Sequence, residues 1–289
     1  MFTMAVHYIE NEFIRVGVKE HGAELTSVVS KKTGFEYIWQ GDEAVWYGQS
    51  PILFPIVGRL IEDKYTLNGT EYTMPKHGFA RKSDFTLLSK DADTMTFILS
   101  ESSATKAIFP YDFDLIVTFT IEENALRVSH DVVNKNEDTM YFSLGAHPGF
   151  NCAIGDTLRF DEKETLSTEK IDLVHSLRLP DRIPVLNDET DIVITKDIFN
   201  EDALILSGIK SENVTLCSDN HDRTVKFNLG GAPYLGIWAK PAAPYVCIEP
   251  WCGVNDDTNK VADFSEKTGI QALPADEVFN FTWEAVFSE

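Results

Sequence analysis

Residues 141–151 read Tyr-Phe-Ser-Leu-Gly-Ala-His-Pro-Gly-Phe-Asn, a stretch that begins as a strand and ends as a turn. Tyr141, Phe142 and Leu144 favour extended backbone. The Pro-Gly pair that follows His147 ends the strand. A titratable ring at this break is held by a rigid sheet and faces the opening beyond it. A lone histidine is more often structural than catalytic, so a functional role for His147 depends on similar strand ends elsewhere in the chain.

Most of the remaining sequence reads as short strands separated by turn signals. Asn68-Gly69 lies between extended residues, which is the strongest short-range signal of a β-hairpin. Apolar side chains alternate along residues 278–287 and predict a closing strand that packs its aromatic residues into the core. His130 lies on another alternating segment, where a buried structural histidine is the expected role.

Helical signals are few and short, and the best candidates are residues 197–206 and 259–267. Many strands without amphipathic helical spacers argue against a βαβ fold. The sequence therefore predicts an all-β fold, a large antiparallel β-sandwich with few short helices. Residues 161–200 are rich in charge and contain two prolines, so they are interpreted as a long excursion or a linker. Because strands continue on both sides of it, one domain over residues 1–289 is expected.

Composition excludes several classes of partner. The formal net charge of −21 argues against nucleic acid and anionic membranes. The sequence has no apolar run of about 18 residues, as a membrane-spanning helix requires, and its N-terminus lacks the pattern of a signal peptide. The four cysteines are scattered without metal-site spacing, which indicates reduced thiols and no structural metal. A cytoplasmic protein is expected.

Four stretches end apolar strands with polar, titratable residues. They are Leu-Phe-Pro-Ile-Val-Gly-Arg-Leu at 53–60 with Arg59, His-Gly-Phe-Ala-Arg at 77–81 with His77 and Arg81, Gly-Ala-His-Pro-Gly-Phe at 145–150 with His147, and Ile-Glu-Pro-Trp at 248–251 with Glu249. Such an inventory suits a neutral or anionic polyol, because arginines bind hydroxyls or phosphate and Trp238 can stack on a sugar face. A glutamate and a histidine suffice to move a proton from one oxygen to another.

Taken in order, these four stretches resemble the aldose 1-epimerase (galactose mutarotase-like) family, and most closely its bacterial LacX-like branch. The resemblance spans nearly the whole chain and implies the same large antiparallel β-sandwich. It implies that Glu249 acts as general base on the anomeric hydroxyl O1 and that His147 acts as general acid on the ring oxygen O5. It further implies that His77 holds or polarises O5 and that Arg59 binds sugar hydroxyls. No metal, nucleotide or redox cofactor is implied.

The sequence departs from the galactose mutarotases in one respect, because their additional substrate-binding aspartate has no clear counterpart here. Arg59 and Arg81, with Lys82 or Lys240, resemble the basic set of hexose-6-phosphate mutarotases in the same superfamily. The expected ligand is thus a small sugar or a sugar phosphate, bound by a monomer or a homodimer. A non-catalytic carbohydrate-binding or sensor protein on the same scaffold is a second alternative. A glycoside hydrolase is a weaker one, since it needs two carboxylates.

Overall fold

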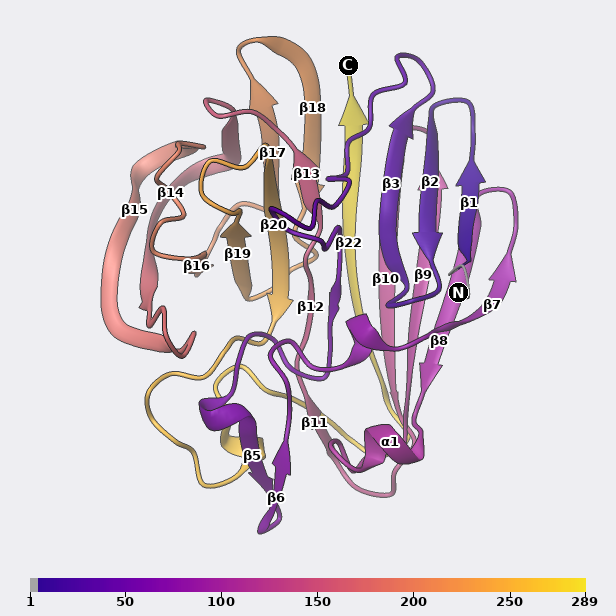
Figure 1. Ribbon diagram of the computed structural model, residues 1–289, viewed down its shortest axis with the longest axis vertical. Helices are drawn as coiled ribbons and strands as arrows, with labels where there is room; N and C mark the ends of the chain where they lie inside the picture. Colours follow the sequence, from indigo (N-terminus) through magenta and orange to yellow (C-terminus); the bar gives the residue numbers. More distant parts are fainter. Residues whose placement is uncertain (1–4) are drawn as a thin grey trace.

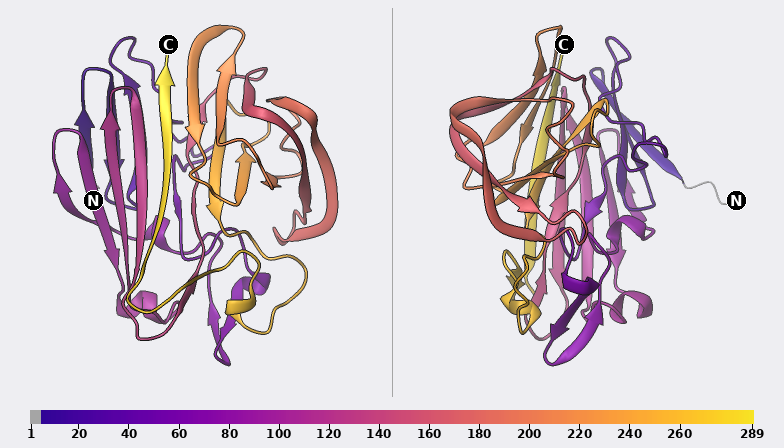
Figure 2. Two further views of the ribbon diagram at one scale, coloured as in Figure 1. Left: turned by 180° about the vertical axis from the view of Figure 1, so that it is seen from behind. Right: turned by 60° about the vertical axis from the view of Figure 1, so that its left-hand side comes forward.

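The structure, a computed structural model that describes residues 5–289, consists mainly of antiparallel strands (Figures 1 and 2). Its largest sheet contains nine of them. In spatial order these are β15 (Arg178–Val193), β14 (Thr157–Ile171), β17 (Asn213–Ser218), β18 (His221–Asn228), β22 (Val278–Ser288), β10 (Ala125–Asn134), β9 (Phe113–Glu122), β8 (Thr94–Ser100) and β7 (Thr86–Lys90).

A second, six-stranded sheet carries the residues that the later sections concern. It consists of β16 (Leu204–Ser207), β19 (Tyr234–Trp238), β20 (Tyr245–Cys252), β12 (Leu144–Ala146) and β4 (Ile52–Leu53), with β13 (Gly149–Asn151) also paired to β20. The smaller sheets are β1 (Val6–Glu10), β2 (Ile14–Lys19) and β3 (Glu24–Ser30); β5 (Lys64–Leu67) and β6 (Thr70–Thr73); and β11 (Met140–Phe142) and β21 (Gln271–Leu273).

The helical elements are single turns. They are α1 (Ser103–Lys106) and the 3-10 turns η1 (Ile61–Asp63), η2 (Ala80–Lys82) and η3 (Phe264–Glu266). Within residues 5–289, none of the helices has the length and apolar character that crossing a bilayer would require.

Two sheets cover one face of the nine-stranded sheet, as Figure 1 shows, and the predicted antiparallel β-sandwich is therefore confirmed. Over β8, the His7 ring of β1 lies 5.8 Å from Phe97. Over β18, the Phe150 ring of β13 lies 5.9 Å from Phe227. The closing strand β22 places Trp283 on this inner face, stacked on Phe227 and almost fully buried. Burying each such side chain contributes about 1.5–3 kcal/mol, so the alternating apolar pattern accounts for the layered core.

Four sequence expectations about local structure have clear outcomes. The hairpin at Asn68-Gly69 is confirmed, since both residues have positive φ between β5 and β6. The linker interpretation of residues 161–200 is wrong, because β14 and β15 form a long curved hairpin there that makes one edge of the nine-stranded sheet (Figures 1 and 2). The helix interpretation of residues 197–206 is also wrong, because a turn leads directly into β16. Of residues 259–267, only the η3 turn is helical.

His130 lies on β10 as expected, with 1% of its surface exposed and its ring 6.0 Å from that of Phe281. Burial lowers the pKa of His130 from 6.5 to about 4, although a backbone hydrogen bond at Phe281 opposes the shift. The folded protein therefore holds this imidazole neutral at pH values where the unfolded chain binds a proton. The stabilisation is complete above pH 6.5 and is lost as the pH falls towards 4.

We accordingly expect the free energy of unfolding of His130→Leu to fall less than that of the wild type when the pH is lowered. Over this range the shift corresponds to about 3 kcal/mol. Urea unfolding at pH 7.5 and pH 4.5 should show a smaller difference in the free energy of unfolding for the variant than for the wild type. An equal difference in both proteins would show that His130 is not held neutral by the fold.

Candidate active site

A cavity of about 470 Å³ brings together residues that are far apart in the sequence. It contains five of the six site residues predicted from the sequence: His77, Arg81, His147, Trp238 and Glu249. They come from η2 and the turn before it, from the break between β12 and β13, and from the neighbouring strands β19 and β20. The convergence that the sequence analysis required is therefore present in the structure.

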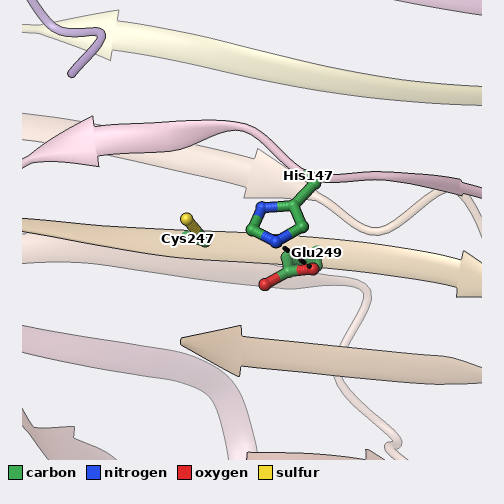
Figure 3. A group of neighbouring side chains, drawn as sticks. All are labelled: His147, Cys247 and Glu249. Atoms are coloured by element: carbon green, nitrogen blue, oxygen red, sulfur yellow. Dashed lines mark ion pairs between the residues drawn. The ribbon is translucent and has the colours of Figure 1, made fainter. Parts of the chain in front are cut away.

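The pairing of β20 explains why His147 and Glu249 meet. All eight residues of β20 are buried, and the strand pairs with β12 before the Pro-Gly break and with β13 after it. Gly145 pairs with Trp251 on one side of the break, and Gly149 pairs on the other side with the residue two positions before Glu249. The register is the same on both sides, so His147 lies opposite Glu249, as Figure 3 shows.

The two side chains are in contact in a dry environment. His147 Nε2 lies 3.2 Å from Glu249 Oε2, and the side chains are 11% and 2% exposed. Burial lowers the pKa of His147 to about 3 and raises the pKa of the Glu249 carboxyl well above its usual value. Loss of hydration disfavours both charges. A single proton shared by this pair consequently favours the carboxyl group and leaves the imidazole neutral.

His77 is held in one tautomer by the backbone. Its Nδ1 accepts a hydrogen bond from the Gly58 amide at 3.1 Å, and its own amide donates to the Gly58 carbonyl at 2.7 Å. Burial lowers the pKa of His77 well below its usual value, so the ring is neutral. A neutral imidazole that accepts at Nδ1 carries its proton on Nε2. His77, whose ring lies 6.0 Å from that of His147, can therefore donate a hydrogen bond to a ligand.

Two tryptophans enclose the His147 ring. Trp46 stacks on it with ring centroids 5.1 Å apart, and Trp238 meets it edge-on at 5.8 Å. Gly149 permits this arrangement, because a Cβ there would lie 2.9 Å from the Trp46 ring. The two aromatic rings bury most of the His147 ring and leave apolar surface facing the cavity.

The two predicted arginines have different positions. Arg81 lines the cavity, donates Nη2 to the Lys76 carbonyl at 2.8 Å, and has its pKa lowered by burial. Arg59 does not line the cavity in the described part of the chain. Its guanidinium instead donates two hydrogen bonds of 2.7 Å to Asp63, which lies four residues later on η1. This pairing occupies the fork of nitrogens that a sugar would need.

Lys240, one of the two lysines named with the arginines, lines the cavity, and so do three residues that the sequence did not indicate: Trp46, Lys76 and Asp202. Asp202 lies just before β16 in a left-handed conformation with φ 76°, which Asp tolerates better than most residues. One carboxylate oxygen accepts from the Ala203 amide at 2.8 Å. The mistaken helix over residues 197–206 concealed this residue, because it placed Asp202 inside a regular element rather than at a strand entrance.

Comparison with protein families gives a match over most of the chain. Residues 5–269 match the family model described as aldose 1-epimerase. The LacX protein encoded on a plasmid of Lactococcus lactis subsp. lactis is 32% identical, over 93% of this chain and 95% of its own length. An Escherichia coli (strain K12) protein provisionally named a glucose-6-phosphate 1-epimerase is 28% identical, over 61% of this chain and 60% of its own.

Solved structures show the same similarity over the full length. A galactose mutarotase related enzyme from Lactobacillus acidophilus superposes with a TM-score of 0.94 at 31% identity, covering 99% of this chain and 98% of that one. A galactose mutarotase-like protein from Lactobacillus casei superposes with a TM-score of 0.93 at 30% identity, covering 98% and 100%.

Proposed function

This chain belongs to the aldose 1-epimerase family, and from that premise we propose that it interconverts the α and β anomers of a hexose. The observation that carries the proposal is the direct contact between His147 and Glu249 inside a sugar-sized cavity. The anomeric hydroxyl oxygen and the ring oxygen of a hexose are bonded to the same carbon. Two neighbouring proton-transfer groups can therefore act on both oxygens of one bound sugar.

In the proposed ring opening, Glu249 takes the proton from the O1 hydroxyl while His147 gives a proton to O5. The C1–O5 bond breaks, and the O1–C1 bond becomes the aldehyde. The reacting pair begins with a carboxylate and an imidazolium, and it ends with a carboxylic acid and a neutral imidazole. No net proton is gained or lost by the protein.

Ring closure reverses these roles. After rotation about C1–C2, neutral His147 takes the proton from the O5 hydroxyl, O5 attacks C1, and Glu249 returns a proton to O1. The pKa shifts support this half of the cycle, because burial favours the protonated carboxyl and the neutral imidazole that the open-chain sugar requires. The reaction begins with a Glu249 carboxylate and a His147 imidazolium. The sugar hydroxyls and the fixed hydrogen-bond donors of the cavity must stabilise these two charges.

The remaining cavity residues are assigned to binding. His77 donates from Nε2 towards O5, Trp238 packs on the sugar face, and Arg81 contributes positive charge at the cavity wall. Asp202 accepts from sugar hydroxyls with the carboxylate oxygen that Ala203 does not use. These contacts hold the sugar through rotation about C1–C2 in the open form.

We expect Asp202→Asn to raise KM roughly tenfold or more with a smaller effect on kcat, since hydrogen bonds to a charged group contribute about 1.5–3 kcal/mol. Glu201→Gln is the matched control, because it removes the neighbouring carboxylate, which is exposed. Steady-state anomer exchange measured for both variants checks the assignment. Equal KM values for the two variants would remove Asp202 from the binding site.

The experiment that tests the proposed function is saturation-transfer NMR on wild-type protein with glucose or galactose. Uncatalysed mutarotation already occurs in water, so the measured quantity is the exchange rate above buffer. We expect this rate to increase in proportion to protein concentration. Calorimetric binding of sugar without added exchange would establish a binding or sensor protein instead.

A second candidate substrate is a hexose 6-phosphate, and one observation favours it. Lys76, Arg81 and Lys240 all line the cavity, which gives it local positive charge within a strongly acidic protein. The similarity to the provisionally named E. coli glucose-6-phosphate 1-epimerase also favours a phosphorylated substrate. Running the exchange assay on glucose and on glucose 6-phosphate decides between them, because only a phosphate-binding site would prefer the phosphorylated sugar and be inhibited by inorganic phosphate.

A further inference from the structure

We propose that His147, Cys247 and Glu249 form a binding site for a thiophilic divalent cation such as Zn²⁺. The potential ligand atoms of these three residues all lie within 4.8 Å of one another, and all three residues are buried. Cys247 is the unexpected member, because the proposed sugar chemistry leaves its thiol unused. Figure 3 shows Cys247 and Glu249 on the same strand, with the His147 ring directed towards them from the neighbouring segment.

Rigid backbone holds the three side chains in place. Cys247 and Glu249 are two residues apart on β20, so they share one face of the strand. Cys247 pairs with Gly149 of β13 on one side and with Trp238 of β19 on the other. Cys247 and Glu249 are thus fixed within a paired strand, and His147 lies in the two-residue break between the paired strands β12 and β13, as a preorganised metal site requires.

The geometry is close to that of a zinc site. Zinc bonds of about 2.0–2.3 Å in tetrahedral geometry place neighbouring ligand atoms roughly 3.3–3.6 Å apart. His147 Nε2 and Glu249 Oε2 are already 3.2 Å apart. The Cys247 sulfur lies within 4.8 Å of both of these atoms, so it must approach them by about 1 Å to complete the tetrahedral spacing. Three protein ligands leave a fourth position open towards the cavity for water or a ligand.

The charges and the ligand types also fit. A thiolate, a carboxylate and a neutral imidazole neutralise Zn²⁺, which lowers the cost of placing charge in a buried site. Among residues 5–289, Glu249 Oε2 has no contact of hydrogen-bonding geometry, and it lies at ion-pair distance from His147 Nε2, which is itself a proposed ligand atom. Sulfur and nitrogen ligands select zinc-like ions over Mg²⁺ and Ca²⁺. On binding, the thiol and the carboxyl group release their protons to solvent.

Occupancy by such an ion would inhibit the enzyme. This consequence, unlike the binding itself, rests on the proposed function, because the metal would use the same Nε2 and carboxylate oxygen that move the sugar proton. The site is therefore an inhibitory one, distinct from any metal requirement of the reaction.

Metal binding to the metal-free protein tests the proposal directly. Zn²⁺ is titrated in competition with a chromogenic chelator, and Co²⁺ is titrated while the thiolate-to-cobalt absorption is recorded. We expect one Zn²⁺ per chain in the wild type, at least tenfold weaker binding in Cys247→Ser together with loss of the cobalt band, and weaker binding in Glu249→Gln. Cys252→Ser is the matched control, since this second buried thiol of β20 lies on the opposite face and should leave both signals unchanged.

The outcomes separate this proposal from the proposed function. Equal zinc affinity in the wild type and in Cys247→Ser, or no stoichiometric binding in the wild type, would overturn the metal site whatever the sugar assay shows. Cys247-dependent binding in a protein without anomer exchange would leave the metal site standing and remove the proposed reaction. Where both are correct, Zn²⁺ slows exchange over the concentration range that fills the site.

Discussion

Glu249→Gln is expected to lower the catalysed rate of anomer exchange by roughly 10²–10⁴-fold, the range typical of a positioned general base. The substitution keeps the shape of the side chain but removes the group that accepts the O1 proton. Glu249 is 1% exposed, and burial already favours its uncharged form, so a neutral amide should be tolerated in the fold. The loss should therefore appear in kcat, with sugar binding retained.

Two measurements accompany this prediction. Calorimetry should give a dissociation constant for sugar close to that of the wild type, and circular dichroism should show the same strand content. A Glu249→Gln variant that exchanges anomers at the wild-type rate would mean that another group is the base. Asp202 would then be the first candidate, since it lines the same cavity.

His147→Asn is expected to cause a loss of similar size, about 10²–10⁴-fold. Asparagine retains a polar side chain but cannot cycle between a proton donor and a proton acceptor. Trp46 and Trp238 pack on the ring of His147 and carry no group that could take over its proton transfer. Both directions of the reaction should slow equally, because His147 acts on O5 in opening and in closing.

The control for this variant is His175→Asn. His175 pairs with Asp172, its ring is 68% exposed, and it lies outside the cavity lining in the described structure. Exchange should be unchanged in His175→Asn under conditions where His147→Asn is nearly inactive. Comparable rates in the two variants would exclude His147 as the acid.

The fold could be predicted largely from local patterns. Alternation along residues 278–287 and the turn signal at Asn68-Gly69 act over a few residues, and the structure confirms both. The hairpin of β14 and β15 escaped prediction because charged residues interrupt its apolar pattern and fewer than a third of its residues are buried. Strand pairing there depends on a partner strand rather than on an apolar pattern, and Pro184 suggested an interruption that the bulged register accommodates.

The candidate site was predictable where chemistry is concentrated at strand ends, as for His147 and Glu249. The positions of the other site residues depend on contacts between distant segments, which the sequence does not show. Arg59 pairs with the nearby carboxylate of Asp63, and a sequence motif does not reveal that this carboxylate competes with a ligand for the guanidinium. Asp202 and Trp46 reach the cavity from turns whose direction depends on the whole sheet. The proximity of Cys247 to the pair follows from the register of β20 with β13, which involves residues about one hundred positions apart.

The central claim is that Glu249 and His147 act as one proton-transfer unit. Saturation-transfer exchange on Glu249→Gln, His147→Asn and the double variant, measured side by side with the wild type, tests it most directly. We predict that each single substitution removes nearly all catalysis and that the double variant is hardly slower than either, because groups that act together are not additive. A double variant whose loss equals the product of the two single losses would show that the residues act independently, which contradicts the shared-proton mechanism.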